Sequence, residues 1–214
     1  MGVITVLAGT NGAGKSSIGG ALVRRGGGAY YNPDDETRAI LAANPALDLA
    51  QANGLAWAMG LENLRNAIAG DTDYAFETTL GGNTITRILI EGAESADVSL
   101  RVWYCGLASP ELHLDRVRAR VAAGGHDIPA NKIRARYDSS RRNLLRLMPH
   151  LTDLQVFDNS FSADPRHGSP PRPVRVLKVV KRHLVYPVTA PDLKKTPAWA
   201  KPLVAAAVEA FAGL

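Results

Sequence analysis

Short runs of apolar, mostly β-branched residues recur along the chain and predict the strands of a sheet. The run Val3–Ala8 is almost continuously apolar, which is typical of a strand buried on both faces. Further strands are predicted at residues 29–32, 73–79, 98–104, 155–158 and 174–180. We expect the last of these to lie at an edge of the sheet and to pair antiparallel.

Between these runs, apolar residues recur at helical spacing. They predict helices at residues 15–25, from 34 onwards, at about 46–69, from 83 onwards, and at 110–123, 129–148 and 203–211. Ser109-Pro110-Glu111 is a typical helix start, with a capping hydroxyl, a proline and an acid in the first turn. Strands that alternate with helices predict an α/β fold with a parallel sheet flanked by helices on both faces. We expect a single domain over residues 1–214, which includes the strand and helix at 174–214.

The first predicted strand leads into a phosphate-binding motif. Residues 9–16 read G-T-N-G-A-G-K-S, the pattern GxxxxGKS, between a strand and a helix. Backbone N–H groups of such a loop cradle phosphate oxygens, the lysine reaches the β- and γ-phosphates, and the serine hydroxyl binds Mg²⁺. The motif predicts a P-loop NTPase-type fold with ATP and Mg²⁺ as ligands. The assigned binding residues are Gly9, Asn11, Gly12, Ala13, Gly14, Lys15, Ser16 and Ser17, with Ser16 on the metal.

Lys15 has a second expected property. Without nucleotide we expect its side chain to be solvated, so that its replacement would leave the fold intact.

Composition sets the broad class. The chain has 214 residues, 46% hydrophobic and 21% charged, as in ordinary globular proteins. Its single cysteine, Cys105, excludes an intramolecular disulfide, suits a reducing compartment and is expected in the core. No apolar run is long enough to span a bilayer, and the first strand leaves no room for a signal peptide. We therefore expect a cytoplasmic protein.

The formal charge is +5, and the excess of positive charge lies in one segment. Arginines and lysines crowd residues 116–146, which predicts a helical arginine-rich lid over about 110–148. Arginines that close over a phosphoryl-transfer site stabilise the charge of its transition state. For most of these arginines a solvated basic face is the better interpretation. Arg120 and Arg136 flank the glycines at 124–125 and are the two that we assign to the lid.

Carboxylates follow two of the predicted strands, where ligands bind in sheets of this type. Asp34 follows the second strand, and we assign it as the base that orients the acceptor hydroxyl and takes its proton. The alternative is a helix-start acid without a catalytic role. Glu77 ends the third strand and fits either an acid near the magnesium or an acceptor of substrate hydroxyl groups.

At this point the chain resembles the zeta toxin family of P-loop kinases, particularly its short, free-standing bacterial members. Four blocks carry the resemblance: Gly9–Ser17, Asn32-Pro33-Asp34, Phe76–Leu80, and Gly124–Pro129 followed by Ile133 and Arg136-Tyr137. It implies a kinase that uses ATP and magnesium to phosphorylate the aminosugar of UDP-N-acetylglucosamine, and an antitoxin protein as a possible partner. Asp34 resembles the family's catalytic base. Glu77, Thr78 and Thr79 resemble its substrate-binding block, and Arg120 and Arg136 its phosphate-contacting arginines.

The sequence therefore predicts an ATP-dependent kinase of a small hydroxyl-bearing molecule, with a nucleotide sugar favoured. One alternative is a kinase for another metabolite or an antibiotic. Another is a P-loop ATPase that grips nucleic-acid phosphates with the arginine segment, which would give a steep salt dependence. Tyr137 is the only aromatic residue in that segment, so stacking on single-stranded bases is disfavoured and nucleic acid is not an expected partner.

Overall fold

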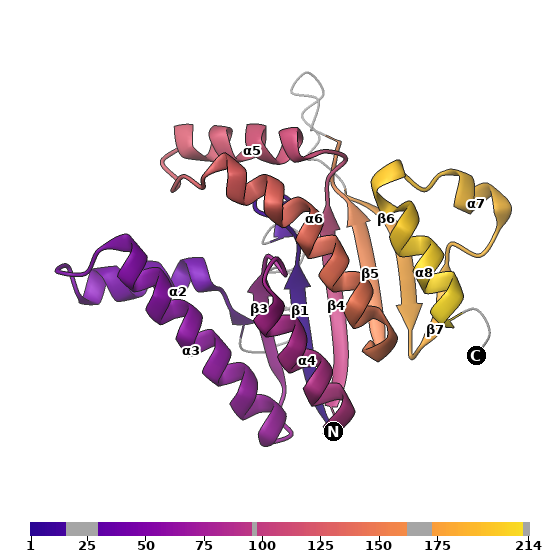
Figure 1. The fold of residues 1–214 in the computed structure, drawn as a ribbon, viewed down its shortest axis with the longest axis horizontal. Coiled ribbons are helices and arrows are strands. Elements are labelled where there is room, and N and C mark those ends of the chain that lie inside the picture. Colours follow the sequence, from indigo (N-terminus) through magenta and orange to yellow (C-terminus); the bar gives the residue numbers. More distant parts are fainter. Residues whose placement is uncertain (16–29, 96–97, 162–172, 212–214) are drawn as a thin grey trace.

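The structure, a computed structural model, describes residues 1–15, 30–95, 98–161 and 173–211. The described residues form a seven-stranded sheet with the strand order β2-β3-β1-β4-β5-β6-β7 (Figure 1). The strands are β1 (Gly2–Ala8), β2 (Tyr30–Tyr31), β3 (Tyr74–Thr78), β4 (Val98–Gly106), β5 (Asp153–Asp158), β6 (Val174–Val180) and β7 (His183–Tyr186).

The strand that leads into the phosphate motif lies in the middle of the sheet. β1 pairs in parallel with β3 on one side and with β4 on the other, and β2–β3 and β4–β5 are also parallel. The predicted parallel sheet is thus confirmed, and five carboxyl ends meet at one edge. β2 lies outside β3, so the strand before Asp34 is not a direct neighbour of β1.

The far side of the sheet differs from the prediction in one strand. β6 pairs antiparallel with β5, as expected, but it is not an edge, because β7 pairs antiparallel with its outer side. β7 has only four residues, with a pattern of exposed and half-buried positions. Such a short, solvated run carries little hydrophobic signal.

The helices cover the sheet between and after its strands. They are α2 (Pro33–Ala43), α3 (Leu49–Ala69), α4 (Asn83–Ser95), α5 (Pro110–Ala122), α6 (Ala130–Leu147), α7 (Ala190–Lys194) and α8 (Lys201–Phe211), with short 3-10 turns at Met148–His150 and Ala198–Ala200. α3, α4, α6 and α8 lie over one face of the sheet (Figure 1). The predicted helix 15–25 lies, except for Lys15, outside the described residues.

The core lies between these helices and the covered face. Alternate residues of the central strands point into it, for example Ile4 and Val6 of β1 and Val102 of β4. They pack against buried leucines of the helices, such as Leu64 of α3 and Leu144 of α6. Each fully buried side chain of this size stabilises the fold by roughly 1.5–3 kcal/mol. The carboxyl ends of the strands are thereby held on a rigid base.

Helix caps fix where the two site-bearing helices begin. Asn32 caps α2 by accepting a hydrogen bond from the Asp34 backbone N–H, 2.9 Å away, and Pro33 follows at the first position. Asp48 and Gln51 form a capping box that starts α3 at Leu49, three residues later than predicted. From there α3 runs without a break to Ala69.

The arginine-rich segment divides into two parts. α5 and the start of α6 share a small core of Leu114, Val117, Ile128 and Ile133, and α5 lies beyond the carboxyl ends of the central strands (Figure 1). The second half of α6 instead packs on the sheet through Leu144 and Leu147, which belong to the main core. Only the first part of the segment 110–148 therefore projects over the site as a lid would. Within the described residues, no helix has the length and apolar character that a membrane crossing requires.

Candidate active site

The phosphate loop follows β1 and is shaped by close contacts that exclude side chains. Gly9 has a φ of 140°, and a Cβ atom there would lie 2.2 Å from the carbonyl oxygen of Cys105. Gly14 has a φ of 85°, and a Cβ atom there would lie 2.4 Å from Nδ2 of Asn159. At each of these two positions, only glycine tolerates both the positive φ and the close approach of the neighbouring atom. Cys105 itself is buried, as predicted, and burial raises the pKa of its thiol to about 12.

Three contacts hold the outside of the loop. Asn159 donates from Nδ2 to the Ala13 carbonyl at 2.9 Å, and Arg116 donates from Nη2 to the Asn159 carbonyl at 2.6 Å. His113 of α5 bonds through Nδ1 to the Asn11 carbonyl at 2.8 Å. The lid helix and the end of β5 therefore fix the loop together. No pattern in the sequence marks His113, or the contact that Arg116 makes, as part of this site.

Lys15 is not solvated, contrary to the expectation from sequence. Its side chain is 7% exposed, and Nζ lies 2.8 Å from the Gly9 carbonyl oxygen and 3.4 Å from Oε1 of Glu77. Tyr30 donates its hydroxyl to Oε2 of Glu77 at 2.6 Å. The burial follows from strand register, because Glu77 pairs with Leu7 and so stands beside the strand that carries the loop. A buried carboxylate requires such partners.

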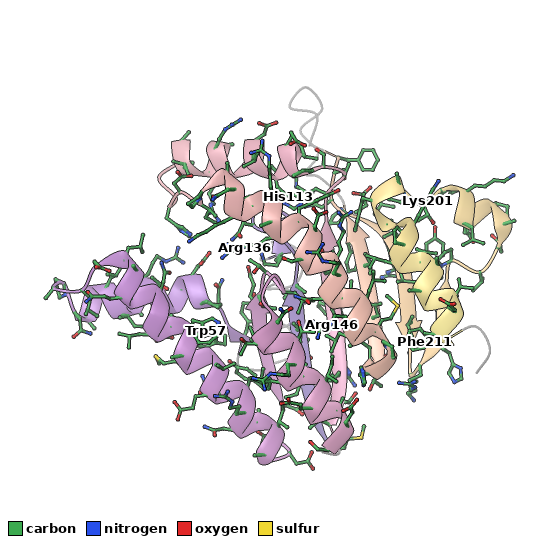
Figure 2. The ribbon with its side chains drawn as sticks, viewed as in Figure 1. Trp57, His113, Arg136, Arg146, Lys201 and Phe211 are labelled. Carbon is green, nitrogen blue, oxygen red and sulfur yellow. The ribbon has the colours of Figure 1, made fainter. Side chains whose placement is uncertain are left out.

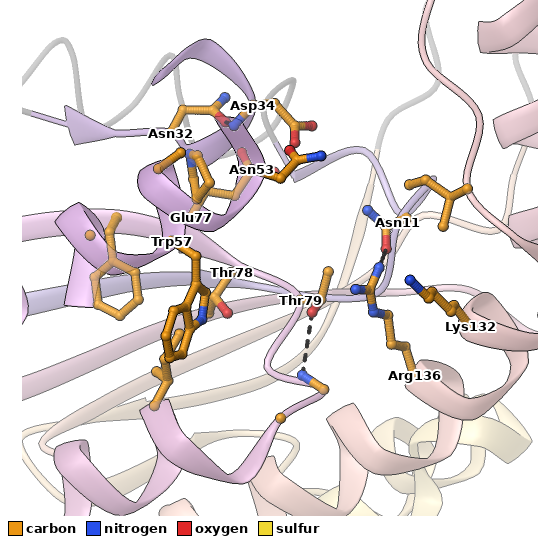
Figure 3. A pocket seen from close by; sticks show the side chains of 18 of the residues that line it. Asn11, Asn32, Asp34, Asn53, Trp57, Glu77, Thr78, Thr79, Lys132 and Arg136 are labelled. Atoms are coloured by element: carbon orange, nitrogen blue, oxygen red, sulfur yellow. Dashed lines mark hydrogen bonds between the residues drawn. The ribbon is translucent and has the colours of Figure 1, made fainter. Parts of the chain in front are cut away.

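A cavity of about 750 Å³ opens beside the loop at the carboxyl ends of the strands. Its wall includes seven of the predicted site residues: Asn11, Lys15, Asp34, Glu77, Thr78, Thr79 and Arg136. Figure 3 labels all of them except Lys15. The structure thus brings together side chains from the loop, α2, β3 and α6. Gly9, Gly12, Ala13 and Gly14 form the loop itself, and Ser16 and Ser17 lie outside the described residues.

Asp34 and Arg136 approach the loop from two sides. Asp34 is half-buried in the first turn of α2. Arg136 donates from Nη1 to Oδ1 of Asn11 at 2.8 Å, and its carbonyl accepts the Thr10 hydroxyl at 3.2 Å. Burial lowers the pKa of the Arg136 guanidinium, and the negative charge of Asp34 opposes that change. The two charges therefore face each other across the cavity.

Arg120 takes a different position from Arg136. It donates from Nη2 to the His126 carbonyl at 3.1 Å, and its Cγ would lie 2.7 Å from a Cβ atom on Gly125. Among the described residues it is not part of the cavity wall. In this conformation Arg120 holds the hinge between α5 and α6, and its contact with phosphates stays a prediction.

The threonines after Glu77 shape the next loop. Thr78 Oγ1 accepts the backbone N–H of Leu80 at 3.0 Å, and Leu80 has a φ of 53°, which is unusual for a leucine. Asn143 of α6 secures this turn by donating from Nδ2 to the carbonyls of Leu80 at 2.9 Å and Gly82 at 3.1 Å. The sequence around Asn143 gives no signal of this role.

The donor groups fit a magnesium–nucleotide complex better than a bare ion. No cluster of three or more metal-binding His, Cys, Asp or Glu side chains occurs among the described residues. Mg²⁺ usually keeps several waters and takes one or two protein oxygens together with the substrate phosphates. Glu77 and Asp34 line the same cavity as Lys15, so carboxylates are at hand, and Ser16 would add the hydroxyl that the motif implies.

The His113 contact predicts how stability depends on pH. Because its partner is a carbonyl, Nδ1 carries the proton, and burial lowers the pKa of the ring to about 4. The unfolded chain binds a proton near pH 6.5 while the folded chain does not. The free energy of unfolding should therefore fall by about 3 kcal/mol between about pH 6.5 and pH 4.

Urea titrations at several pH values measure that slope. His113→Gln should be less stable at pH 7 but should show a shallower loss towards pH 4.5, while replacement of the exposed His183 by alanine should leave the slope unchanged. Equal slopes in wild type and His113→Gln would contradict a neutral His113.

Together, the central phosphate loop, the parallel strands and the convergent cations define a protein of the P-loop NTPase class. The family comparison agrees with a P-loop domain. The chain belongs to the AAA domain family, whose model (AAA_33) matches residues 4–144.

Relatives and solved structures extend the picture. A Haemophilus influenzae protein described as uncharacterized is 30% identical over 136 residues, which cover 60% of this chain and 88% of that protein. A chain of the AvrRxo1-ORF1:AvrRxo1-ORF2 crystal structure with sulphate ions superposes with a TM-score of 0.67 at 16% identity, over 93% of this chain. The match spans only 64% of that longer chain.

Two further structures share the fold. A chain of the PezAT chromosomal toxin–antitoxin system of Streptococcus pneumoniae matches with a TM-score of 0.54 at 15% identity, over 100% of this chain and 79% of that one. A putative kinase from Chloroflexus aurantiacus matches with a TM-score of 0.51 at 16% identity, over 63% and 75%.

Proposed function

We propose that this chain transfers the γ-phosphoryl group of ATP to a hydroxyl group of a small molecule, with UDP-N-acetylglucosamine or a related nucleotide sugar as the favoured acceptor. The observation that carries the proposal is the single cavity that Lys15, Asp34 and Arg136 reach from three different elements. A phosphate-binding cation, a carboxylate and a second cation around one space are what transfer to a hydroxyl requires. The zeta toxin resemblance supports the choice of acceptor.

In this proposal each residue has a distinct role. Asp34 accepts the hydroxyl proton while the acceptor oxygen forms a bond to the γ-phosphorus and the bond to the bridging oxygen of ADP breaks. Lys15 and Arg136 stabilise the charge on the transferred group. Glu77, Thr78 and Thr79 hold the other hydroxyl groups of the acceptor. Bound Mg²⁺, held by Ser16, would supply further neutralisation of the phosphates.

A partner protein is also proposed. Two of the matching folds were solved within named pairs, AvrRxo1-ORF1 with AvrRxo1-ORF2 and the PezAT toxin–antitoxin system. An antitoxin-like protein that binds near the cavity would restrain this kinase.

The nucleic-acid alternative is weaker than the charge total suggests. Three of the arginines in the basic segment already pair with nearby acids: Arg118 with Asp115, Arg134 with Glu111 and Arg141 with Asp138. Arg141 also lies 4.0 Å over the Tyr137 ring, which leaves that ring less open to a nucleobase. These contacts break up the continuous basic surface that a phosphate backbone needs.

A screen of acceptors tests the proposed function. Purified protein, ATP and magnesium would be incubated with nucleotide sugars, other hydroxyl-bearing metabolites and aminoglycosides, and ADP would be measured. We expect ADP formation to depend on one class of acceptor, with UDP-N-acetylglucosamine among the active compounds. Activity with an antibiotic or another metabolite alone would favour the alternative kinase.

The lid arginines give a kinetic prediction. Arg136→Ala and Arg120→Ala should lower the turnover number more than they weaken ATP binding, because lid arginines meet the most charge in the transition state. The loss should be larger for Arg136, which reaches the phosphate loop. Arg134→Ala is the matched control, since Arg134 lies on the same helix and pairs with Glu111 on the surface. Normal turnover in both lid variants would contradict a role of these arginines in stabilising the transition state.

A further inference from the structure

The cavity has two ends of different chemical character. Asn11, Lys132 and Arg136 occupy one end, where phosphates are expected (Figure 3). Trp57 of α3 lies at the other end, across the cavity from Arg136 (Figure 3). Apolar side chains such as Leu61, Leu64 and Ile85 line the cavity as well, together with the polar side chains of Asn53 and Thr78. No charged side chain of α3 joins the lining among the described residues, although the helix carries Glu62 and Arg65.

Trp57 is not needed to hold α3 on the sheet. The helix is anchored by a buried row that includes Ala56, Leu61 and Leu64, whereas Trp57 is 49% exposed (Figure 2). A large aromatic side chain that remains half exposed on a cavity wall keeps apolar surface available for a ligand.

The position of Trp57 relative to Asp34 is fixed by neighbouring contacts. The hydroxyl of Thr37 in α2 bonds to Oδ1 of Asn53 in α3 at 3.0 Å. The Tyr31 hydroxyl donates to the Ala56 carbonyl, one residue before Trp57. Its ring packs where a Cβ atom on Gly60 would lie, 2.6 Å from Cε1. The helix that carries the base and the helix that carries the indole are therefore held together.

We infer that the acceptor carries a flat unsaturated ring that stacks against Trp57, while its reacting hydroxyl lies between Asp34 and Arg136. The inference rests on the proposed function for the role of that hydroxyl. An open-chain polyol would leave the apolar wall in contact with water, whereas a ring would cover it. The ring is either a nucleobase or the apolar aglycone of a glycoside, because both present the same flat surface to an indole.

Binding of matched compounds tests the inference without any catalytic step. Calorimetry would compare uridine with ribose, and p-nitrophenyl glucoside with methyl glucoside, so that each pair differs in the ring. Wild type should bind uridine more tightly than ribose, or p-nitrophenyl glucoside more tightly than methyl glucoside. A preference for uridine indicates a nucleobase, and a preference for the nitrophenyl compound indicates an aglycone. In Trp57→Ala the preferred ligand should bind about 5- to 150-fold more weakly, the range seen when an aromatic stacking partner is removed.

Two variants sharpen the comparison. Trp57→Phe keeps a ring and should restore part of the preference. Leu55→Ala is the matched control, because Leu55 is 48% exposed on the same helix and, among the described residues, does not line the cavity. It should bind as wild type does. Equal binding within both pairs by wild type, or an unchanged preference in Trp57→Ala, overturns the inference.

ADP formation with the same compounds separates this result from the proposed function. Binding that depends on the flat ring, without phosphoryl transfer from ATP, would support the ring site and contradict the proposed kinase activity. Phosphoryl transfer to acceptors that lack a flat unsaturated ring, at a rate that Trp57→Ala does not lower, would support the kinase activity and contradict the ring site.

Discussion

Lys15→Ala should lower phosphoryl transfer by ~10²–10³-fold, the scale reached when a charge-stabilising group is removed from a preorganised site. The lysine ammonium meets the phosphates in the transition state, and no other described lysine is buried beside the loop. Steady-state ADP formation with saturating acceptor measures the loss. Wild-type turnover in this variant would remove the phosphate loop from the mechanism.

The burial of Lys15 changes how that experiment must be controlled. Its removal takes away a cation 3.4 Å from the Glu77 carboxylate, so stability should fall as well as activity. Lys15→Met keeps the apolar stem and should be as inactive while it loses less in thermal midpoint. Lys194→Ala, at an exposed position on α7, should be neutral in both respects. An unfolded Lys15→Met at the assay temperature would be visible in circular dichroism.

Asp34→Asn should lower turnover by ~10²–10⁴-fold, the usual cost of losing a general base. The amide keeps the size of the carboxylate but cannot take the proton. Nucleotide affinity should hold or improve, because one negative charge beside the phosphates is gone. Kinetics with ATP and acceptor varied in turn would separate the two effects.

Two neighbouring substitutions serve as comparisons for Asp34. Asp35→Asn is the matched control, since Asp35 lies in the same first turn but pairs with Arg38 on the surface. It should be near wild type. Glu77→Gln should mainly raise the Michaelis constant of the acceptor if Glu77 holds substrate hydroxyl groups. An active Asp34→Asn beside an inactive Glu77→Gln would reverse the two roles.

The features that could be predicted from the sequence are those set by residues close together along the chain. The strand, glycine loop and following lysine are contiguous, so their position at the carboxyl end of a central parallel strand could be predicted from the motif. Carboxylates such as Asp34 directly after short strands could be placed at the same edge, because parallel strands end together. The α/β alternation also predicted most element boundaries to within a few residues.

What the sequence did not show depends on register and on distant partners. Lys15 is buried because Glu77 of β3 pairs with Leu7 of the neighbouring strand β1. The hydrophobic periodicity of the sequence does not predict that register. His113 reaches the Asn11 carbonyl from 102 residues away, and no local pattern marks it. Arg120 and Arg136 looked equivalent beside the glycine hinge. Their different partners, the His126 carbonyl and the Asn11 side chain, follow only from how α5 and α6 pack.

The most direct test of the central claim follows the γ-phosphoryl group itself. ATP labelled at the γ-position would be incubated with magnesium and the acceptor found in the screen, and label would be counted in the acceptor and in inorganic phosphate. We predict that the acceptor accelerates ADP formation and carries the label, and that Asp34→Asn slows this transfer by ~10²–10⁴-fold. Label released only as inorganic phosphate, at a rate that the acceptor does not change and that nucleic acid stimulates, would contradict a small-molecule kinase.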